Sequence, residues 1–198
     1  MQLTRFMRRI LVFLILCWPL QNGVFAQSVM LTPKQQMALH TETLRELMLK
    51  LYEQHPNELK KSAQVSAREL RDWVFDGKFN WQFEGIRQLQ GKEALALVFD
   101  DTYQGDKILP LIVGLETLLF KGYGAKNEYQ IPTEVDPILL NQTACGVQAF
   151  NAQYDEHVNS LSRHENTQAL IRQVLEQTIQ IIKKNNALTM QCKSSLNH

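Results

Sequence analysis

The chain has 198 residues, and its 21 Lys or Arg and 20 Asp or Glu side chains give a formal net charge of only +1. Proteins that bind nucleic acid usually carry a basic patch or stripe that neutralises phosphates, and no such cluster occurs in this sequence. The composition therefore argues against a nucleic-acid partner, and the length suits one domain with a single core.

Residues 1–26 have the three parts of a secretory signal peptide. Three arginines lie within residues 5–9 without an acidic neighbour, and residues 10–20 form an apolar run. Residues 24–26 (Val-Phe-Ala) offer small side chains at the two positions that a signal peptidase reads. We therefore expect removal of this segment, leaving a single domain of residues 27–198 that is periplasmic or secreted.

An uncleaved membrane anchor is the alternative to cleavage after Ala26. About 20 consecutive apolar residues are needed to cross the hydrocarbon core of a bilayer. Pro19, Gln21 and Gly23 interrupt the apolar run of this segment. Cleavage is therefore the favoured interpretation.

Helix start signals recur along the mature chain. Residues 32–35 (Thr-Pro-Lys-Gln) combine an N-cap hydroxyl, a proline at the first helical position and a glutamine that can complete a capping box. Apolar residues then recur at three- and four-residue steps up to Pro56, which indicates a helix with one buried face. A second capping box at residues 66–69 (Ser-Ala-Arg-Glu) predicts a short helix that ends near Gly77.

The middle of the chain contains its most hydrophobic mature segment. A short helix is expected over residues 91–99, and residues 108–120 are rich in Ile, Leu, Val and Phe. We expect residues 108–120 to form the buried central helix. Gly122 stands where a left-handed C-cap residue would end it.

Two more helices complete the predicted fold. Asp136 and Pro137 begin one that carries Cys145, and an apolar stripe over residues 170–182 predicts a last helix ending at Asn185. No long alternating pattern of a strand competes with these signals. The sequence therefore predicts an all-α, single-domain irregular bundle of about five or six helices, with one short extended segment.

That extended segment is aromatic. Residues 79–83 (Phe-Asn-Trp-Gln-Phe) alternate with the period of a strand. Either they form a connector that presses three rings into the core, or they pair with residues 128–131, and we favour the connector. Rings of this kind also line pockets for apolar or sugar ligands. Core packing is the favoured account of these rings, and a binding surface made of Trp73, Phe79, Trp81 and Phe83 is the alternative.

Two cysteines, Cys145 and Cys192, remain after the expected cleavage. An oxidising compartment favours their pairing into one disulfide. A metal site is the rival interpretation, but the two thiols lack the close spacing of zinc ligands. We predict a disulfide between them.

No metal or cofactor is predicted. His157 and His164 lie among acidic residues, but their spacing matches no ligand motif. A calcium loop opening at Asp100 fails because its twelfth position is Leu111 instead of a bidentate glutamate. His40 falls on the apolar face of the first helix, where we expect a hydrogen-bonded core histidine.

Glu116 is the one carboxylate with a possible catalytic position, because helical spacing places it among apolar residues. Burial there would raise its pKa, as in many general acids and bases. The favoured interpretation is a glutamate at the edge of the stripe or paired with Arg68, Arg71 or Arg87. The chain has neither a nucleophile motif nor a phosphate-binding loop.

Together these features favour an exported, non-enzymatic helical module that binds another envelope protein or an apolar or sugar ligand. One alternative is peripheral membrane association through residues 108–120, which are too few to span a bilayer but can lie in its interface. A second alternative is a hydrolase that uses Glu116 with a neighbouring acid.

Overall fold

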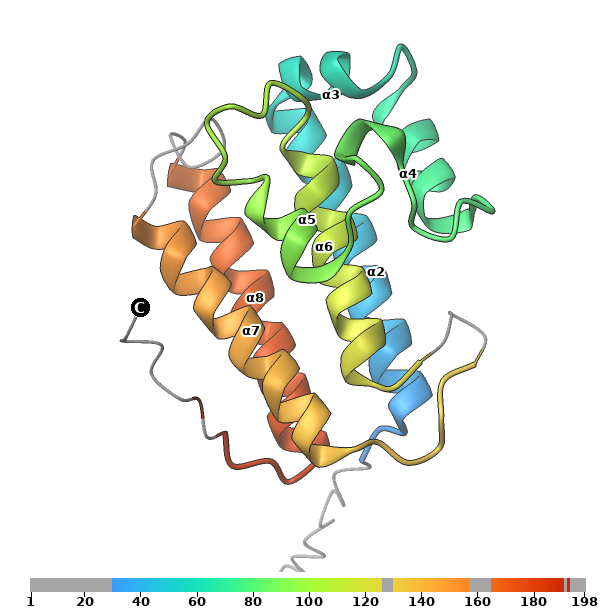
Figure 1. Ribbon diagram of the computed structural model, residues 1–198, viewed down its shortest axis with the longest axis vertical. Coiled ribbons are helices and arrows are strands. Elements are labelled where there is room, and N and C mark those ends of the chain that lie inside the picture. The colour runs from blue at the N-terminus through green and yellow to red at the C-terminus, as the bar shows by residue number, and fades with distance from the viewer. Residues whose placement is uncertain (1–29, 126–129, 157–164, 191, 193–198) are drawn as a thin grey trace, which may run out of the picture.

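The computed structural model describes residues 30–125, 130–156, 165–190 and 192. The expected signal peptide, His157 and His164 lie outside these ranges. Within them the chain is all-α, as predicted, with seven α-helices, one short 3-10 helix and no strand (Figure 1). The elements are α2 (Pro33–Gln54), α3 (Pro56–Ser62), α4 (Ala67–Asp76), η1 (Glu84–Ile86), α5 (Gly91–Ala96), α6 (Ile108–Gly122), α7 (Pro137–Glu156) and α8 (Glu165–Asn185).

The helix that sequence analysis missed is α3. Pro56 was expected to end the first helix, and it does so, but it also occupies the first turn of α3. Proline is favoured there because its missing N–H would have no partner in any case. The same residue therefore separates two helices.

The capping box predicted at the start of α2 is confirmed, and the one predicted at the start of α4 is confirmed for its N-cap bond. Thr32 Oγ1 accepts a hydrogen bond from the Gln35 N–H, and Gln35 Oε1 accepts one from the Thr32 N–H. At the start of α4, Ser66 Oγ accepts from the Glu69 N–H. These bonds satisfy backbone donors that a helix leaves without partners at its start.

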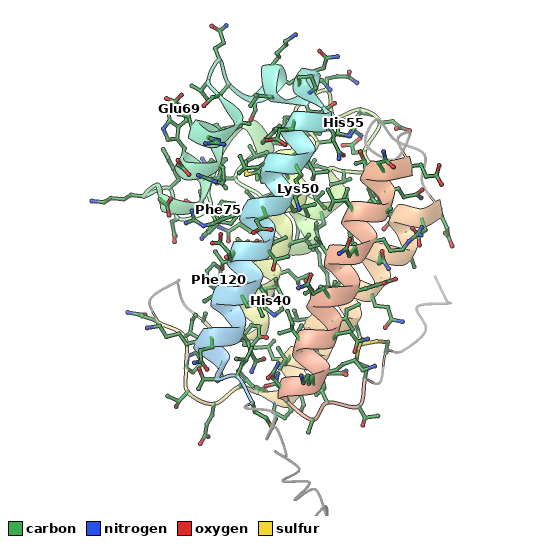
Figure 2. All side chains as sticks on the ribbon, turned by 180° about the vertical axis from the view of Figure 1, so that it is seen from behind. His40, Lys50, His55, Glu69, Phe75 and Phe120 are labelled. Atoms are coloured by element: carbon green, nitrogen blue, oxygen red, sulfur yellow. A yellow bond between two sulfur atoms is a disulfide. The ribbon has the colours of Figure 1, made fainter. Side chains whose placement is uncertain are left out.

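The four longest helices form a ring in which α2 contacts α6 and α8, and α7 contacts the same two helices. Helices α2 and α8 are antiparallel, because the start of each helix lies beside the end of the other. The Leu31 N–H donates to Asn185 Oδ1 at 2.8 Å, and His55 Nε2 lies 2.8 Å from Thr167 Oγ1. Figure 2 shows His55 at the far end of α2 from its start, and α2 beside α8 along their length.

Helix α6 lies at the centre, as predicted. Every residue from Ile108 to Phe120 except Thr117 is buried, because α2, α5 and α7 all pack against this helix. It is antiparallel to α2: Tyr52 at the end of α2 bonds Asp106 before α6, and His40 near the start of α2 bonds Tyr123 after it. Among the described residues, no helix is long and apolar enough to cross a membrane.

The end of α6 corrects one prediction. Gly124, and not Gly122, has the left-handed conformation, with φ +67°. The Ala125 N–H donates to the Phe120 carbonyl at 2.9 Å, which closes the last turn in the usual way for a glycine C-cap. A Cβ on Gly122 would lie 2.4 Å from Thr143 Oγ1, so Gly122 serves the close packing of α6 against α7.

Helix α5 packs across α6 and is joined to it by a hydrogen bond. The Gly91 N–H donates to Thr117 Oγ1 at 2.7 Å. Close approach is possible because Gly114 of α6 has no side chain: a Cβ there would lie 2.7 Å from Leu95 Cγ. Figure 1 shows α5 lying over α6 on the side away from α2.

The aromatic segment is a connector, but it turns sharply. The Gln82 N–H donates to the Phe79 carbonyl at 2.9 Å, and the two residues between them have positive φ, 47° at Asn80 and 61° at Trp81. This is the pattern of a type I′ turn, which usually has Asn-Gly at these positions. Of the suggested partner strand 128–131, residues 128 and 129 lie outside the described ranges.

The predicted disulfide joins Cys145 of α7 to Cys192 after α8, across a sequence separation of 47 residues. It closes a loop that contains the second half of α7 and all of α8. Such a loop lowers the entropy of the unfolded chain and thereby stabilises the folded one.

Reducing this disulfide should destabilise the protein without unfolding it at room temperature. In the entropic model a loop of this size contributes about 4 kcal/mol, and measured values are usually lower, so we expect a loss of about 2–4 kcal/mol. Urea denaturation of oxidised and reduced protein measures the difference. A Cys145→Ala, Cys192→Ala double variant should match the reduced protein, and equal stability of all three would contradict the expectation.

Candidate functional site

A pocket of about 230 Å³ lies between α4, the aromatic connector and the residues before α6. Its lining combines aromatic rings with polar and acidic groups. The lining residues are Lys61, Ser62, Ala63, Leu70, Trp73, Phe79, Phe83, Glu84, Gly85, Tyr103, Gly105, Asp106 and Leu109. We call it the aromatic pocket.

Three of the four predicted binding residues line this pocket. Trp73 of α4 is 45% exposed and Phe79 of the connector is 52% exposed, whereas most large apolar side chains are buried. Phe83 is half-buried, and its ring centroid lies 5.6 Å from that of Phe79. Helix α4 also packs on the core, where Val74 and Phe75 are buried together with Leu70, which reaches the pocket as well.

Trp81 belongs to the core instead. Its ring meets Phe75 edge-on at 5.4 Å between centroids and lies 6.0 Å from Phe120 of α6. The left-handed backbone at Trp81 costs about 1–2 kcal/mol for a residue with a side chain. Burial of the indole among these rings offsets that cost. The prediction that the connector presses three rings into the core is therefore correct for Trp81, correct in part for Phe83, which is half-buried against the core, and wrong for the exposed Phe79.

Trp81 also forms part of the wall of a second, larger pocket of about 560 Å³ between the connector, α5, α6 and α7. Its other lining groups are mostly polar, including Gln90, Lys92, Glu93, Thr117, Lys121 and Gln142. Four lining residues have positive φ: Asn80, Trp81, Gly91 and Gly124. We call it the polar pocket.

The inner end of the aromatic pocket carries a buried carboxyl group. Asp106 Oδ2 accepts a hydrogen bond from the Tyr52 hydroxyl, and Oδ1 accepts one from the Ile108 N–H at 2.8 Å. Ser62 also hydrogen-bonds this carboxyl group. Burial raises the pKa of Asp106 to about 6, although its hydrogen bonds partly oppose that rise.

A second buried carboxylate supports the same corner of the fold. Glu58 Oε2 accepts from the Lys107 N–H at 2.9 Å, and its Oε1 accepts from Lys61 Nζ at 2.7 Å. The Lys107 ammonium donates to the carbonyls of Val98 and Asp100, at 3.1 and 3.0 Å. Lys61 is therefore paired with Glu58, and Lys107 is bound to backbone oxygens.

Tyr103 fixes η1, which follows the connector, to this corner. Its hydroxyl donates to the Gly85 carbonyl at 2.9 Å, with the Asp106 carbonyl 3.1 Å away. Burial raises the pKa of Tyr103 to about 12, so the hydroxyl stays protonated as a donor. From the sequence alone this stretch suggested only a calcium loop that lacks its last ligand, because no local pattern shows that Tyr103 and Asp106 lie beside α4.

Glu116 lies in the packed interior. Its side chain is fully buried, and its Oε1 accepts a hydrogen bond from Thr41 Oγ1 of α2 at 2.5 Å. It lines neither the aromatic nor the polar pocket. The expectation that Glu116 lies at the edge of the stripe is therefore wrong. The hydrogen bond to its Oε1 comes from the Thr41 hydroxyl, whereas an arginine had been considered as its partner.

His40 is a core histidine, as predicted. Its Nε2 lies 3.0 Å from the Tyr123 hydroxyl, which also donates to Gln36 Oε1 at 2.9 Å. Asn186 donates to the same Gln36 oxygen, so the network joins α2, the end of α6 and the end of α8. Burial lowers the pKa of His40 to about 4.

His40 and Asp106 should affect acid stability in opposite directions. With a folded pKa of about 4, His40 stays neutral while the unfolded chain takes up a proton below about pH 6.5, so stability falls toward pH 4. With a folded pKa of about 6, Asp106 takes up its proton before the unfolded chain does, so stability rises over the same range. The two contributions should largely cancel.

Single variants separate these two contributions. Between pH 6 and pH 4, the His40→Gln protein should gain stability relative to wild type, and the Asp106→Asn protein should lose it, by about 1 kcal/mol per pH unit. Urea denaturation of the three proteins at both pH values measures this. Parallel pH dependences of all three would show that neither group is responsible.

Within the residues that the structure describes, no three His, Cys, Asp or Glu side chains gather where they could hold a metal ion. Groups whose pKa is shifted by burial lie at the Asp106 corner, in the His40 network and at Tyr154 of α7. Only the Asp106 corner is continuous with a pocket that contains exposed rings.

Comparison with known proteins assigns no family to this chain. No protein-family model matches it, and no curated protein or solved structure is significantly similar to it.

Proposed function

We propose that the chain is an exported, non-enzymatic binding module that holds part of another envelope component in the aromatic pocket. The observation that carries this proposal is the exposure of Trp73 and Phe79 around one cavity. Large rings left half in solvent beside a pocket are typical of recognition surfaces, since packing alone would bury them.

The size of the pocket supports recognition of a single group. Ligand pockets usually have volumes of roughly 300–1,000 Å³, and this one has about 230 Å³. A cavity of that size fits one large side chain or one ring. In protein interfaces such anchor groups, buried in a small pocket, contribute much of the binding energy.

The two alternative functions have less support. Peripheral membrane contact through residues 108–120 would require α6 to leave the centre of the bundle, where its apolar side chains are already buried. A hydrolase that uses Glu116 would need a cleft at that side chain, which is fully buried.

Site-specific photo-crosslinking in the producing cells tests the proposal. A photoreactive phenylalanine analogue at position 79 should give a covalent adduct, and Trp73→Ala should abolish it. Leu39, which is 39% exposed on α2, provides the matched control position. Equal adducts at positions 39 and 79, or an adduct that persists in Trp73→Ala, would contradict a specific pocket.

Export has a separate test. Protein from the periplasm or the medium should begin at or near Gln27, as measured by intact mass. A full-length chain found only in the membrane fraction would overturn the exported, soluble interpretation.

A second candidate ligand is a sugar in the polar pocket. The specific observation is that Trp81, amide side chains and four residues with positive φ meet there. Positive φ is unfavourable at Asn80 and Trp81, which carry side chains, and such conformations persist where the surroundings enforce them, as is common at binding sites. Titration of Trp73→Phe protein with N-acetylglucosamine should then shift the Trp81 fluorescence, and Gln142→Ala should remove the shift. An unchanged spectrum would remove this candidate.

A further inference from the structure

We infer that the group held in the aromatic pocket is an organic cation, an ammonium or guanidinium on an apolar stem. The inference rests on the proposed function and names its ligand class. It combines three observations: two carboxylates without a cationic partner, a lysine whose charge is already paired, and three aromatic rings around one cavity.

Two carboxylates line the aromatic pocket. Asp106 is 2% exposed, and its hydrogen-bond donors, Tyr52, Ser62 and the Ile108 N–H, are all uncharged. Glu84 lies on the connector side of the pocket, where its Oε1 accepts from Gln88 Nε2 at 2.8 Å. Among the described residues, neither carboxylate forms a salt bridge with Lys, Arg or His.

The nearby cations do not supply the missing charge. Lys61 lines the pocket, but its ammonium is bound to Glu58 Oε1 at 2.7 Å. Lys107 donates to two backbone carbonyls away from Asp106. Arg87 acts electrostatically on Tyr103 and Asp100 and is not part of the pocket lining. The lining therefore has an excess of negative charge.

The rings favour the same ligand class. The face of an aromatic ring attracts a cation, and the attraction is stronger when water is excluded. The fold already contains such a contact near this pocket, since the Arg45 guanidinium lies 4.9 Å from the centroid of the Phe75 ring. In the pocket, Trp73, Phe79 and Phe83 offer three further rings beside the two carboxylates.

Other ligand classes fit less well. An anionic ligand would be repelled by the carboxylates of Asp106 and Glu84, and this repulsion is stronger in a partly buried site. A neutral apolar group would gain the contact with the rings but would leave the negative charge without a partner. An ammonium on an apolar stem gains both interactions.

Choline and its uncharged isostere 3,3-dimethylbutan-1-ol provide the direct test, because they share a shape and differ in charge. Calorimetric titration of the mature, oxidised protein should show choline binding about tenfold more tightly than the alcohol. Glu84→Gln and Asp106→Asn should each weaken choline binding several-fold and leave alcohol binding unchanged. Glu69→Gln, on the same helix as Trp73 but outside the pocket, should change neither.

The possible outcomes separate the two proposals. If both compounds bind equally and Trp73→Ala weakens both, the pocket is an aromatic binding site but the ligand is not a cation. If neither binds at millimolar concentration, the cation assignment is overturned, and the crosslinking at position 79 still decides the proposed function.

A second titration distinguishes the source of the cation. N-acetyl-lysine methylamide and N-acetyl-arginine methylamide represent side chains of a partner protein, whereas choline represents a free ligand. Tighter binding of either amide than of choline assigns the pocket to a protein side chain, and the reverse assigns it to a small molecule. Asp106→Asn must retain its helical signal for these comparisons to be valid, and Glu84→Gln, at an exposed position, serves as the second variant.

Discussion

Replacing Leu115 by Asp is expected to unfold the domain. Leu115 is 1% exposed in α6, the helix that contacts α2, α5 and α7. A charged carboxylate without a partner costs several kcal/mol in a packed interior, and domains of this size are stable by only about 5–15 kcal/mol. We expect loss of most of the helical circular dichroism at 25 °C, with no cooperative thermal transition.

A surface variant controls for the change in charge. Ile138, at the start of α7, is 68% exposed, so Ile138→Asp should keep the helical signal and the melting temperature of the wild type. If Leu115→Asp also melted like the wild type and instead lost affinity for lipid vesicles, α6 would be a membrane contact. That result would restore the peripheral-membrane alternative.

Replacing Gly114 by Val is expected to separate α5 from α6. A Cβ at this position would lie 2.7 Å from Leu95 Cγ and 3.0 Å from the Gly91 carbonyl oxygen. The Gly91 carbonyl belongs to the backbone and cannot rotate away, so α5 must shift. Added volume in a packed core costs about 1–3 kcal/mol, and we expect a loss at the upper end of this range.

Urea denaturation measures that loss, and Gly85 provides the control. A Cβ on Gly85 would meet only Leu109 Cδ2, at 3.9 Å, which is an ordinary contact. Gly85→Ala should therefore change stability by less than about 0.5 kcal/mol. If Gly114→Val were as stable as wild type, the close approach of α5 to α6 would not be needed for the fold.

The sequence predicted the helices well where the signals are local. The capping box at Thr32 and Gln35 needs only residues three apart, so its pattern determines the start of α2. The end of α8 at Asn185 and the pairing of Cys145 with Cys192 were also predicted correctly. Burial of α6 followed from composition alone, since its apolar residues cover nearly the whole helix.

The predictions that differ from the structure depend on contacts between distant segments. Gly122 and Gly124 both suit a C-cap by sequence, but Gly122 remains in α6, packed closely on Thr143, and Gly124 takes the left-handed conformation. The alternation of residues 79–83 resembles a strand, but packing of Trp81 against Phe75 and Phe120 stabilises a turn. Tertiary packing overrode the local pattern in both cases.

The candidate site could be predicted only in part. Trp73, Phe79 and Phe83 were identified because aromatic residues cluster in the sequence. Asp106 was not identified as their neighbour, because residues 100–107 meet α3 and α4 only through long-range contacts that leave no local sequence pattern. Its contact with Tyr52 joins positions 54 residues apart. The only available signal was an acidic residue directly before the most apolar segment.

The bond between Cys145 and Cys192 also determines what happens when the polypeptide is cut. Because the two cysteines enclose the second half of α7 and all of α8, a protease that cleaves anywhere between them produces two pieces still joined by sulfur. The piece that carries α8 then stays at high effective concentration next to its binding site on α2 and α7. A molecule cleaved once in this loop can therefore keep its fold, and it migrates as a single band in electrophoresis until a reductant is added.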